Sequence, residues 1–534
     1  MPQVALALSS QNTSVMTEEM VSTKETTWLL IVVALVGLLL FYWSSSTGLQ
    51  TDELLFLRAI ELGPVDGLLA PGSSHPPLFR WLVGLCLDGN CPDWVLRTPS
   101  IILSLATIIV WWAIGKRLIS NAFTTACMLP ILAFMPSWLD VAYQLTPYAA
   151  LTFFVTLHTW CWLCFVDSWL NRRRLDKYVA AITLTTTACM WTHFYGLNVL
   201  VADQILWLII WKRDRSIVKR WMASGFLSGL AFLPLIPIVA YYAGLEKAHA
   251  IIRIEEFSTF FIQQSCVLFS DLTFSIPSLG ILLFVWYALI ASTLLKAWLK
   301  LPGPKEIYSS TVAAETLPNL VREWSAVVLA CIFLAGIPAA QAHSWLGQKA
   351  MWSRYIVPAS WSHWPLFVAW VSHRWNRLTL RFVMLTVIGL ILFTLWSVRH
   401  LRPDWTFENE PIQLTLNSHV KSNDAFFVQA MDIWEGDANF DRLWFDRYSP
   451  VKMKVIEGEQ KGRFEIGEQG IDLTSIDSSV DRIWICSNLF DESFLRSQEN
   501  QQWKLSFLSL SVPRRPLALF TRRSTAKQKL VNLD

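Results

Sequence analysis

The sequence predicts an α-helical polytopic membrane protein that ends in a small water-soluble α/β domain. Of its 534 residues, 53% are apolar and only 16% are charged, whereas an ordinary soluble domain carries about 25% charged residues. The charges are also uneven, because residues 399–534 hold 38 of the 85 and residues 1–398 hold the other 47. This composition excludes a single soluble fold, a disordered chain and a coiled coil, and a net charge of +3 gives no support for a nucleic-acid binder.

Apolar stretches of about 20 residues, the length that crosses a bilayer, recur through the first 398 positions. We predict about 11 transmembrane helices, at residues 28–46, 96–115, 122–139, 148–168, 178–192, 196–211, 221–242, 276–296, 324–341, 354–372 and 382–398. Residues 1–27 are polar and no small-residue cleavage site follows the first apolar run, so we expect a cytoplasmic tail rather than a signal peptide. The predicted domains are therefore this tail, a transmembrane domain over 28–398 and a soluble domain over 399–534.

The distribution of Lys and Arg near the helix ends predicts the orientation of the chain, since cytoplasmic loops carry the excess of positive charge. One set of connections, together with the N-terminal tail, holds 19 positive residues: Lys24, Lys116, Arg117, Arg172, Arg173, Arg174, Lys177, Lys212, Arg213, Arg215, Lys219, Arg220, Lys296, Lys300, Lys305, Arg322, Arg374, Arg377 and Arg381. The alternate set holds seven: Arg58, Arg80, Arg97, Lys247, Arg253, Lys349 and Arg354. We therefore expect a cytoplasmic N-terminus and an extracytoplasmic C-terminal domain in the cell membrane.

The outer loops contain the residues that suggest chemistry. Asp52 and Glu53 follow the first span, where they suit the first turn of an interfacial helix with Leu54, Leu55 and Leu57 in the headgroup zone, or serve as a general base or metal ligand.

Further outer residues have both structural and functional interpretations. His75 precedes two prolines that suit a helix start, Tyr143 and Tyr148 suit interfacial anchors, and His193 lies in a tight turn before Gly196. Arg354, beside Tyr355, either snorkels to the interface or binds phosphate oxygens with its planar guanidinium group.

Asp203 is the one Asp, Glu, Lys or Arg well inside a predicted span, and Gln204 follows it. An ion-driven transporter normally buries several such groups along its path. We therefore interpret Asp203 as a hydrogen-bonded contact between helices rather than as part of a site.

The order of these elements resembles a known family. An acidic pair after the first span, His75-Pro-Pro-Leu, Arg97-Thr-Pro-Ser at the second span, Pro147-Tyr148, His193 and Arg354-Tyr355 resemble the polytopic C-type (GT-C) membrane glycosyltransferases of family 39. Within this superfold the chain is most similar to the bacterial branch related to protein O-mannosyltransferases and the lipid A aminoarabinose transferase. The resemblance covers residues 28–400.

The resemblance implies that a hexosyl or pentosyl group moves from a polyprenyl-phosphate donor to a lipid, glycan or protein acceptor on the extracytoplasmic face. Asp52 is then the catalytic carboxylate with Glu53 in support, and Arg354 binds the donor phosphate. The other residues expected to contact the donor or substrate are Tyr355, His75, Arg58, Tyr148 and His193. Asp52 and Glu53 are also candidates for a divalent metal cation, although no His, Asp and Glu cluster shows convincing ligand spacing.

Two departures from the family leave the donor sugar open. Related enzymes often have Arg-Pro-Tyr where this chain has Thr146-Pro147-Tyr148, and aminoarabinose transferases tend to have Lys where this chain has His75. A flippase of lipid-linked sugars and a non-catalytic membrane scaffold are the competing interpretations.

In the soluble domain, residues 425–428, 451–456, 482–486 and 517–520 alternate as strands do, and residues 491–503 suggest a helix. We expect this domain to contact the acceptor or to act as a lid. Cys86 and Cys91 flank a turn in an outer loop and are candidates for a disulfide, whereas Cys161 and Cys164 lie in a predicted span and are expected to be apolar fillers.

Overall fold

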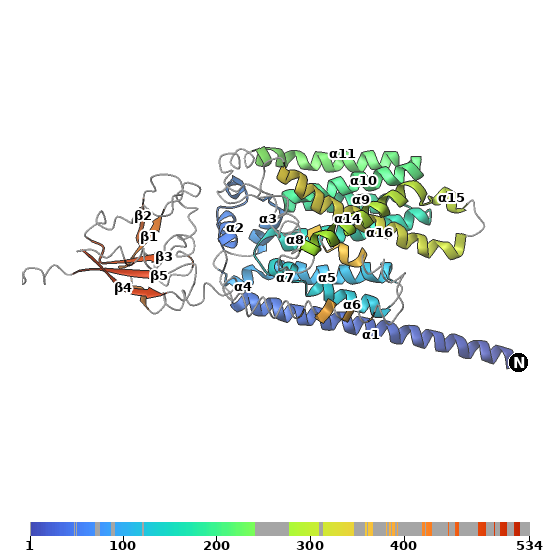
Figure 1. Ribbon diagram of the computed structural model, residues 1–534, viewed down its shortest axis with the longest axis horizontal. Helices are drawn as coiled ribbons and strands as arrows, with labels where there is room; N and C mark the ends of the chain where they lie inside the picture. Colours follow the sequence, from blue (N-terminus) through green and yellow to red (C-terminus); the bar gives the residue numbers. More distant parts are fainter. Residues whose placement is uncertain are drawn as a thin grey trace, which may run out of the picture. The chain divides into compact units, whose positions relative to one another are not determined.

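The computed structural model describes residues 2–46, 49, 51–69, 75–86, 91–119, 122–240, 277–308 and 313–345, and short stretches between 358 and 523 (Figure 1). The chain forms two compact units. The helical unit comprises residues 1–43, 75–87 and 94–399, and the second unit comprises residues 44–74, 88–93 and 400–534. The segment that follows the first span therefore groups with the C-terminal part of the chain.

The helical unit is built from long helices that lie side by side (Figure 1). Its main members are α1 (Pro2–Ser46), α5 (Thr98–Leu118), α8 (Pro147–Leu170), α9 (Asp176–Thr192), α10 (Leu197–Arg213), α11 (Val218–Phe232), α14 (Pro277–Lys300) and α16 (Ala313–Trp345). Shorter members are α3 (Leu78–Cys86), α4 (Asp93–Leu96), α6 (Ala122–Ala133), α7 (Pro136–Ala142) and α15 (Pro304–Tyr308). Among the described residues, five helical segments are long and apolar enough to cross a membrane: Thr23–Ser46, Thr98–Leu118, Pro147–Leu170, Phe194–Arg213 and Arg215–Ala240. The chain is thus a multi-pass helical membrane protein, and most of the last two predicted spans lies outside the described residues.

The third predicted span, 122–139, is wrong as a single helix. The structure has two helices there, because α6 ends at Ala133 and α7 begins at Pro136. Between them Met135 is extended, with φ −62° and ψ 118°. The residue before a proline is sterically biased away from the helical region, so Pro136 explains the break.

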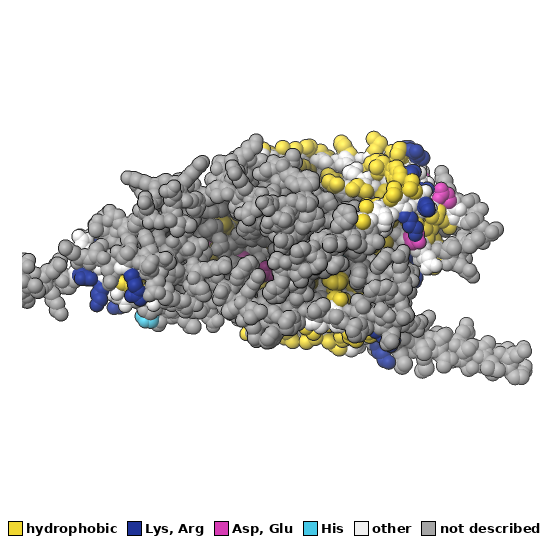
Figure 2. All heavy atoms as spheres, viewed as in Figure 1, with side chains coloured by type: hydrophobic (Ala, Val, Ile, Leu, Met, Phe, Trp, Pro, Cys, Tyr) yellow, Lys and Arg dark blue, Asp and Glu magenta, His cyan; other side chains and the backbone are white. Residues whose placement is uncertain are grey.

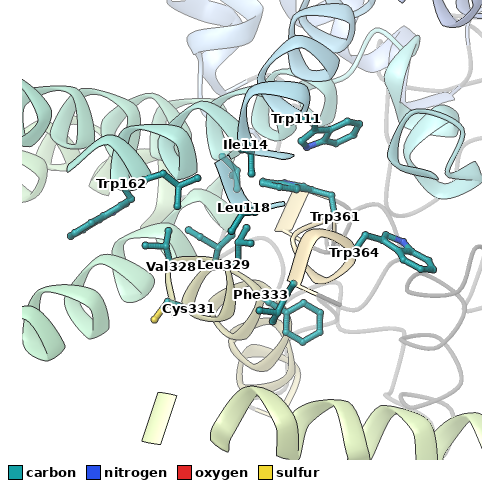
Figure 3. Close-up of a cluster of buried hydrophobic side chains, with 14 of the residues drawn as sticks. Trp111, Ile114, Leu118, Trp162, Val328, Leu329, Cys331, Phe333, Trp361 and Trp364 are labelled. Carbon is teal, nitrogen blue, oxygen red and sulfur yellow. The ribbon is translucent and has the colours of Figure 1, made fainter. Parts of the chain in front are cut away.

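The core of the helical unit forms where α5, α8 and α16 meet. Figure 3 shows Trp111 of α5 beside Trp361, with Trp162 of α8 and Phe333 of α16 in the same cluster of buried side chains. The Trp111 and Trp361 ring centroids lie 5.9 Å apart, and all four side chains are fully buried. Each aromatic side chain buries a large apolar surface, so this cluster stabilises the packing of the three helices.

Ion pairs join the helices at the end of the unit where α5 and α8 finish and α9 and α11 begin. They are Lys116–Glu25 (2.8 Å), Arg117–Asp167 (3.2 Å), Arg220–Asp176 (2.8 Å) and Lys296–Glu323 (3.1 Å). Figure 2 shows coloured Lys and Arg side chains gathered at the α15 end of the helical unit. Every basic partner in these pairs belongs to the set that the sequence assigns to the cytoplasmic side.

Asp203 joins three helices, as the sequence predicts. Its Oδ1 accepts hydrogen bonds from the Trp162 indole nitrogen (2.6 Å) and His158 Nε2 (2.9 Å) on α8, and its Oδ2 accepts one from the Thr186 hydroxyl (2.7 Å) on α9. On α10, the next residue, Gln204, accepts a hydrogen bond from the Trp221 indole nitrogen of α11 (2.8 Å). A buried carboxylate is tolerated only when donors surround it, and here they do.

The second unit contains α2 (Thr51–Glu61), the short 3-10 helix η1 (Asp66–Leu69) and a five-stranded sheet. The strand order is β2-β1-β3-β5-β4, with β1 (Ala425–Gln429) parallel to β2 (Lys454–Gly458) and β3 (Arg482–Cys486). Strand β5 (Leu517–Arg522) runs antiparallel to both β3 and β4 (Trp503–Ser509). Buried Asp424 at the start of β1 accepts a hydrogen bond from the Trp484 indole nitrogen at 2.7 Å and pairs with Arg482 at 3.1 Å.

Three of the four predicted strands match their observed positions closely. The second overlaps β2 from Lys454 onward, and residues 451–453 lie outside the described part of the chain. The predicted helix over 491–503 is wrong at its end, because Trp503 is the first residue of β4 and is fully buried. Most of that predicted helix lies outside the described residues. The sheet explains why Trp503 is buried, because alternate residues of a strand point to the same face of a sheet.

One contact joins the segment at Cys91 and Asp93 to the C-terminal part of the chain within the second unit. Arg447 donates to Asp93 Oδ1 through Nε (3.2 Å) and Nη2 (2.8 Å), and Nη2 also donates to the Cys91 carbonyl oxygen (2.5 Å). Cys91 forms no disulfide with any described side chain. The Cys86 side chain lies outside that set, so the bridge between the two cysteines stays a prediction.

Candidate functional site

The turn after α9 is built around His193. Helix α9 ends at Thr192, and His193 is extended with φ −157° and ψ 144°. Its Nδ1 accepts a hydrogen bond from the Tyr195 backbone N–H at 3.1 Å, which caps the 3-10 helix η2 (Phe194–Gly196). A Cβ on Gly196 would lie 2.2 Å from the Cys189 carbonyl group, so only glycine lets this turn close against α9.

Tyr148 and His75 are positioned by prolines. Tyr148 is the second residue of α8, after Pro147, and its side chain is only 1% exposed. His75 stands two residues before Pro77, whose carbonyl oxygen accepts the first hydrogen bond of α3, from the Trp81 N–H at 2.8 Å. The expectation that the two prolines begin a helix is therefore confirmed.

The structure brings these three predicted residues together. The His75 ring centroid lies 4.6 Å from that of His193 and 5.9 Å from that of Tyr148, and the Tyr148 and His193 centroids are 5.3 Å apart. The ring centroids of Tyr195 and His193 lie 5.4 Å apart. We call His75, Tyr148, His193 and Tyr195 the ring cluster. It can hold a polar ligand through imidazole and phenol groups on an aromatic surface.

Arg97 and Tyr143 form a second buried pair near the start of α5. Arg97 is fully buried, and its guanidinium carbon lies 5.3 Å from the centroid of the Tyr143 ring. Tyr143 is 1% exposed, so it is not an interfacial anchor, and Tyr148 is not one either. From the sequence alone, Tyr195 has no assigned site role and Arg97 is only part of the Arg97-Thr-Pro-Ser motif. For Arg97 the available signal was a charge directly before a membrane helix.

The acidic pair belongs to the second unit. Helix α2 begins at Thr51, and Glu53 is fully buried, followed by buried Leu54, Leu55 and Leu57. The headgroup-zone interpretation of these leucines is therefore wrong, since protein covers them. Asp52 lies in the first turn of α2, and its side chain is outside the described set.

The remaining predicted site residues separate into two cases. Arg58 forms an ion pair with Glu61 at 3.5 Å, one helical turn further along α2. Arg354 and Tyr355 lie outside the described residues, so their roles stay predictions. Among the described residues, no group of three or more His, Cys, Asp and Glu side chains could hold a metal ion.

Comparison with known families gives a match over part of the chain. Residues 74–241 match the family model of dolichyl-phosphate-mannose-protein mannosyltransferases, and this stretch contains the whole ring cluster. This match covers part of the chain and supports its resemblance to the GT-C polytopic membrane glycosyltransferases. The resemblance predicted from its motifs is thereby confirmed. The chain matches no curated protein.

Two solved structures illustrate the structural matches to this chain. ArnT from Cupriavidus metallidurans in the apo state is 14% identical, with a TM-score of 0.41, and the match covers 92% of this chain and 98% of that one. AglB, the oligosaccharyltransferase from Archaeoglobus fulgidus in complex with an inhibitory peptide and a dolichol-phosphate, is 10% identical with a TM-score of 0.41. That match covers 86% of this chain and 69% of AglB. Similarity at this level does not by itself establish a substrate.

Proposed function

We propose that this GT-C glycosyltransferase moves a hexosyl or pentosyl group from a polyprenyl-phosphate carrier to an acceptor hydroxyl on the extracytoplasmic face. The family match over residues 74–241 carries the proposal. The ring cluster supports it, because three residues expected to contact the substrate come from separate segments and lie within 6 Å of one another by ring centroid. The positive-charge pattern of the loops supports a cytoplasmic N-terminus and an extracytoplasmic C-terminal domain in the cell membrane.

The reaction we propose is a single displacement. The Asp52 carboxylate takes the proton of the acceptor hydroxyl as its oxygen attacks the anomeric carbon. The bond between that carbon and the phosphate oxygen breaks, and the electron pair leaves with the polyprenyl phosphate. One base and one attack imply inversion at the anomeric carbon.

Charge develops on the leaving phosphate during this step, so a fixed cation beside it stabilises the transition state more than the ground state. We assign this role to Arg354, with Tyr355 beside it, from the motif alone. Glu53 supports Asp52 in the same motif, and its complete burial within α2 suits a positioning role. The acidic pair also remains our candidate for a divalent cation.

The experiment uses purified full-length protein in lipid nanodiscs and a panel of labelled polyprenyl-phosphate sugars. Transfer of label to an acceptor, with inverted anomeric configuration by NMR of the product, supports the proposal. Movement of the lipid-linked sugar across proteoliposomes, without cleavage of the sugar–phosphate bond, would instead identify a flippase. Retention of configuration would overturn the single displacement while leaving the transferase class intact.

A further inference from the structure

The hydrogen bond at His193 fixes which of its ring nitrogens carries the hydrogen. Nδ1 accepts from the Tyr195 backbone N–H at 3.1 Å, so its lone pair is in use and it carries no hydrogen. A neutral imidazole holds one N–H, which must then be on Nε2. The ring is therefore a hydrogen-bond donor through Nε2 and an acceptor only toward its own turn.

The surroundings keep the ring in this orientation. His193 is 3% exposed and faces the rings of His75, Tyr148 and Tyr195 at centroid distances of 4.6, 5.3 and 5.4 Å. The Gly196 N–H donates to the His193 carbonyl oxygen at 2.8 Å, so the main chain on both sides of the ring is also held. Any contact that this imidazole makes with a ligand runs through Nε2–H.

We propose that His193 Nε2–H donates a hydrogen bond to a phosphate oxygen of the polyprenyl-phosphate carrier, and that His193 takes no part in proton transfer. This inference rests on the proposed function, since it names the part of the donor that the ring cluster contacts. A fixed neutral donor beside the leaving phosphate stabilises the negative charge that develops there. Proton removal from the acceptor is left to the carboxylate.

Two substitutions separate the two nitrogens. His193→Asn places an amide oxygen near the position of Nδ1, so it still accepts from the Tyr195 N–H but offers nothing at Nε2. His193→Gln reaches the position of Nε2 with an amide donor and gives up the acceptor for the turn. The first variant removes the proposed ligand contact and keeps the cap, and the second does the reverse.

The test measures binding of unlabelled polyprenyl phosphate, the carrier without sugar, to the protein in nanodiscs, together with the thermal midpoint of unfolding. We expect His193→Asn to bind about 10-fold to 100-fold more weakly, as loss of one hydrogen bond to a charged group implies, with a nearly unchanged midpoint. We expect His193→Gln to unfold at lower temperature and to bind more tightly than His193→Asn.

Three results would overturn this role. Binding of the carrier by His193→Asn as tightly as by the wild type, with an unchanged KM for the sugar donor, would assign the ring to the turn alone. Weaker binding in both variants, in proportion to their loss of stability, would do the same. Unchanged carrier binding with a higher KM for the sugar donor would move the contact to the sugar. A wild-type protein that binds the carrier but transfers no sugar would contradict the proposed function without affecting the comparison between variants.

Discussion

Replacing Asp203 by leucine tests whether the buried carboxylate holds α8, α9 and α10 together. The substitution keeps most of the volume but removes the acceptor for the Trp162 indole and His158 Nε2. The Thr186 hydroxyl keeps an alternative acceptor, the Ile182 carbonyl oxygen at 2.9 Å. The Trp162 indole N–H is therefore left without an acceptor. His158 Nε2 also loses its partner, even if the ring carries its hydrogen on Nδ1, 2.9 Å from the Thr185 hydroxyl oxygen.

An unsatisfied buried donor costs about 1–3 kcal/mol in soluble proteins, whereas hydrogen bonds between membrane helices contribute about 0.6 kcal/mol on average and about 1.7 at most. For the loss of two hydrogen bonds we expect Asp203→Leu to lower the free energy of unfolding by about 1–3 kcal/mol on this membrane scale. Asp203→Asn should cost less, because its amide oxygen still accepts from both Trp162 and His158.

The assay is SDS-induced unfolding of the purified protein in mixed micelles, followed by tryptophan fluorescence. Gln204→Leu is the matched control, since it removes a single acceptor from the next position of the same helix, at the partly buried Trp221. Equal destabilisation by Asp203→Leu and Gln204→Leu would refute the claim that the carboxylate joins the three helices.

Two further predictions concern positions outside this network. Gly196→Ala should destabilise the protein by about 1–3 kcal/mol, because its Cβ would overlap the Cys189 backbone. Gly225→Ala, with nothing within 4 Å of the new atom, should unfold at the wild-type midpoint or above, and equal effects of the two would contradict the packing argument. Arg447→Ala and Asp93→Ala should each raise the rate of limited proteolysis of the second unit. The double variant should be no worse than Arg447→Ala, which already removes the ion pair and the hydrogen bond to the Cys91 carbonyl oxygen, and additive effects would show that the pair is not coupled.

The sequence predicts the helices of the membrane unit because apolar length and charge at the helix ends are local signals. Helices α8, α9 and α10 begin and end within two residues of the predicted spans. The break between α6 and α7 was also signalled by Pro136, although apolar composition continues through it. Strand β4, which begins at Trp503, was not predicted. It forms by pairing with β5, later in the chain, and its own residues carry no local signal of that pairing.

The candidate site is only partly predictable for a different reason. His75, Tyr148 and His193 stand out by residue type at helix ends, and the fold brings them together. The role of Tyr195 depends on its backbone N–H, which every residue except proline supplies, so no particular residue type marks the position. Arg97 stands out as a candidate only because it is fully buried beside the Tyr143 ring. That burial depends on the packing of segments distant in the sequence, so it could not be predicted from the residue type.

The most direct test of the account is the Asp52→Asn variant, measured for both carrier binding and sugar transfer. Asp66→Asn is the control, because Asp66 is an exposed acid further along the same segment, in η1. Loss of a general base lowers the rate by about 100-fold to 10,000-fold. We predict a fall of this size in kcat for Asp52→Asn with donor binding retained, and no change for Asp66→Asn. Wild-type turnover in Asp52→Asn would contradict the proposed mechanism.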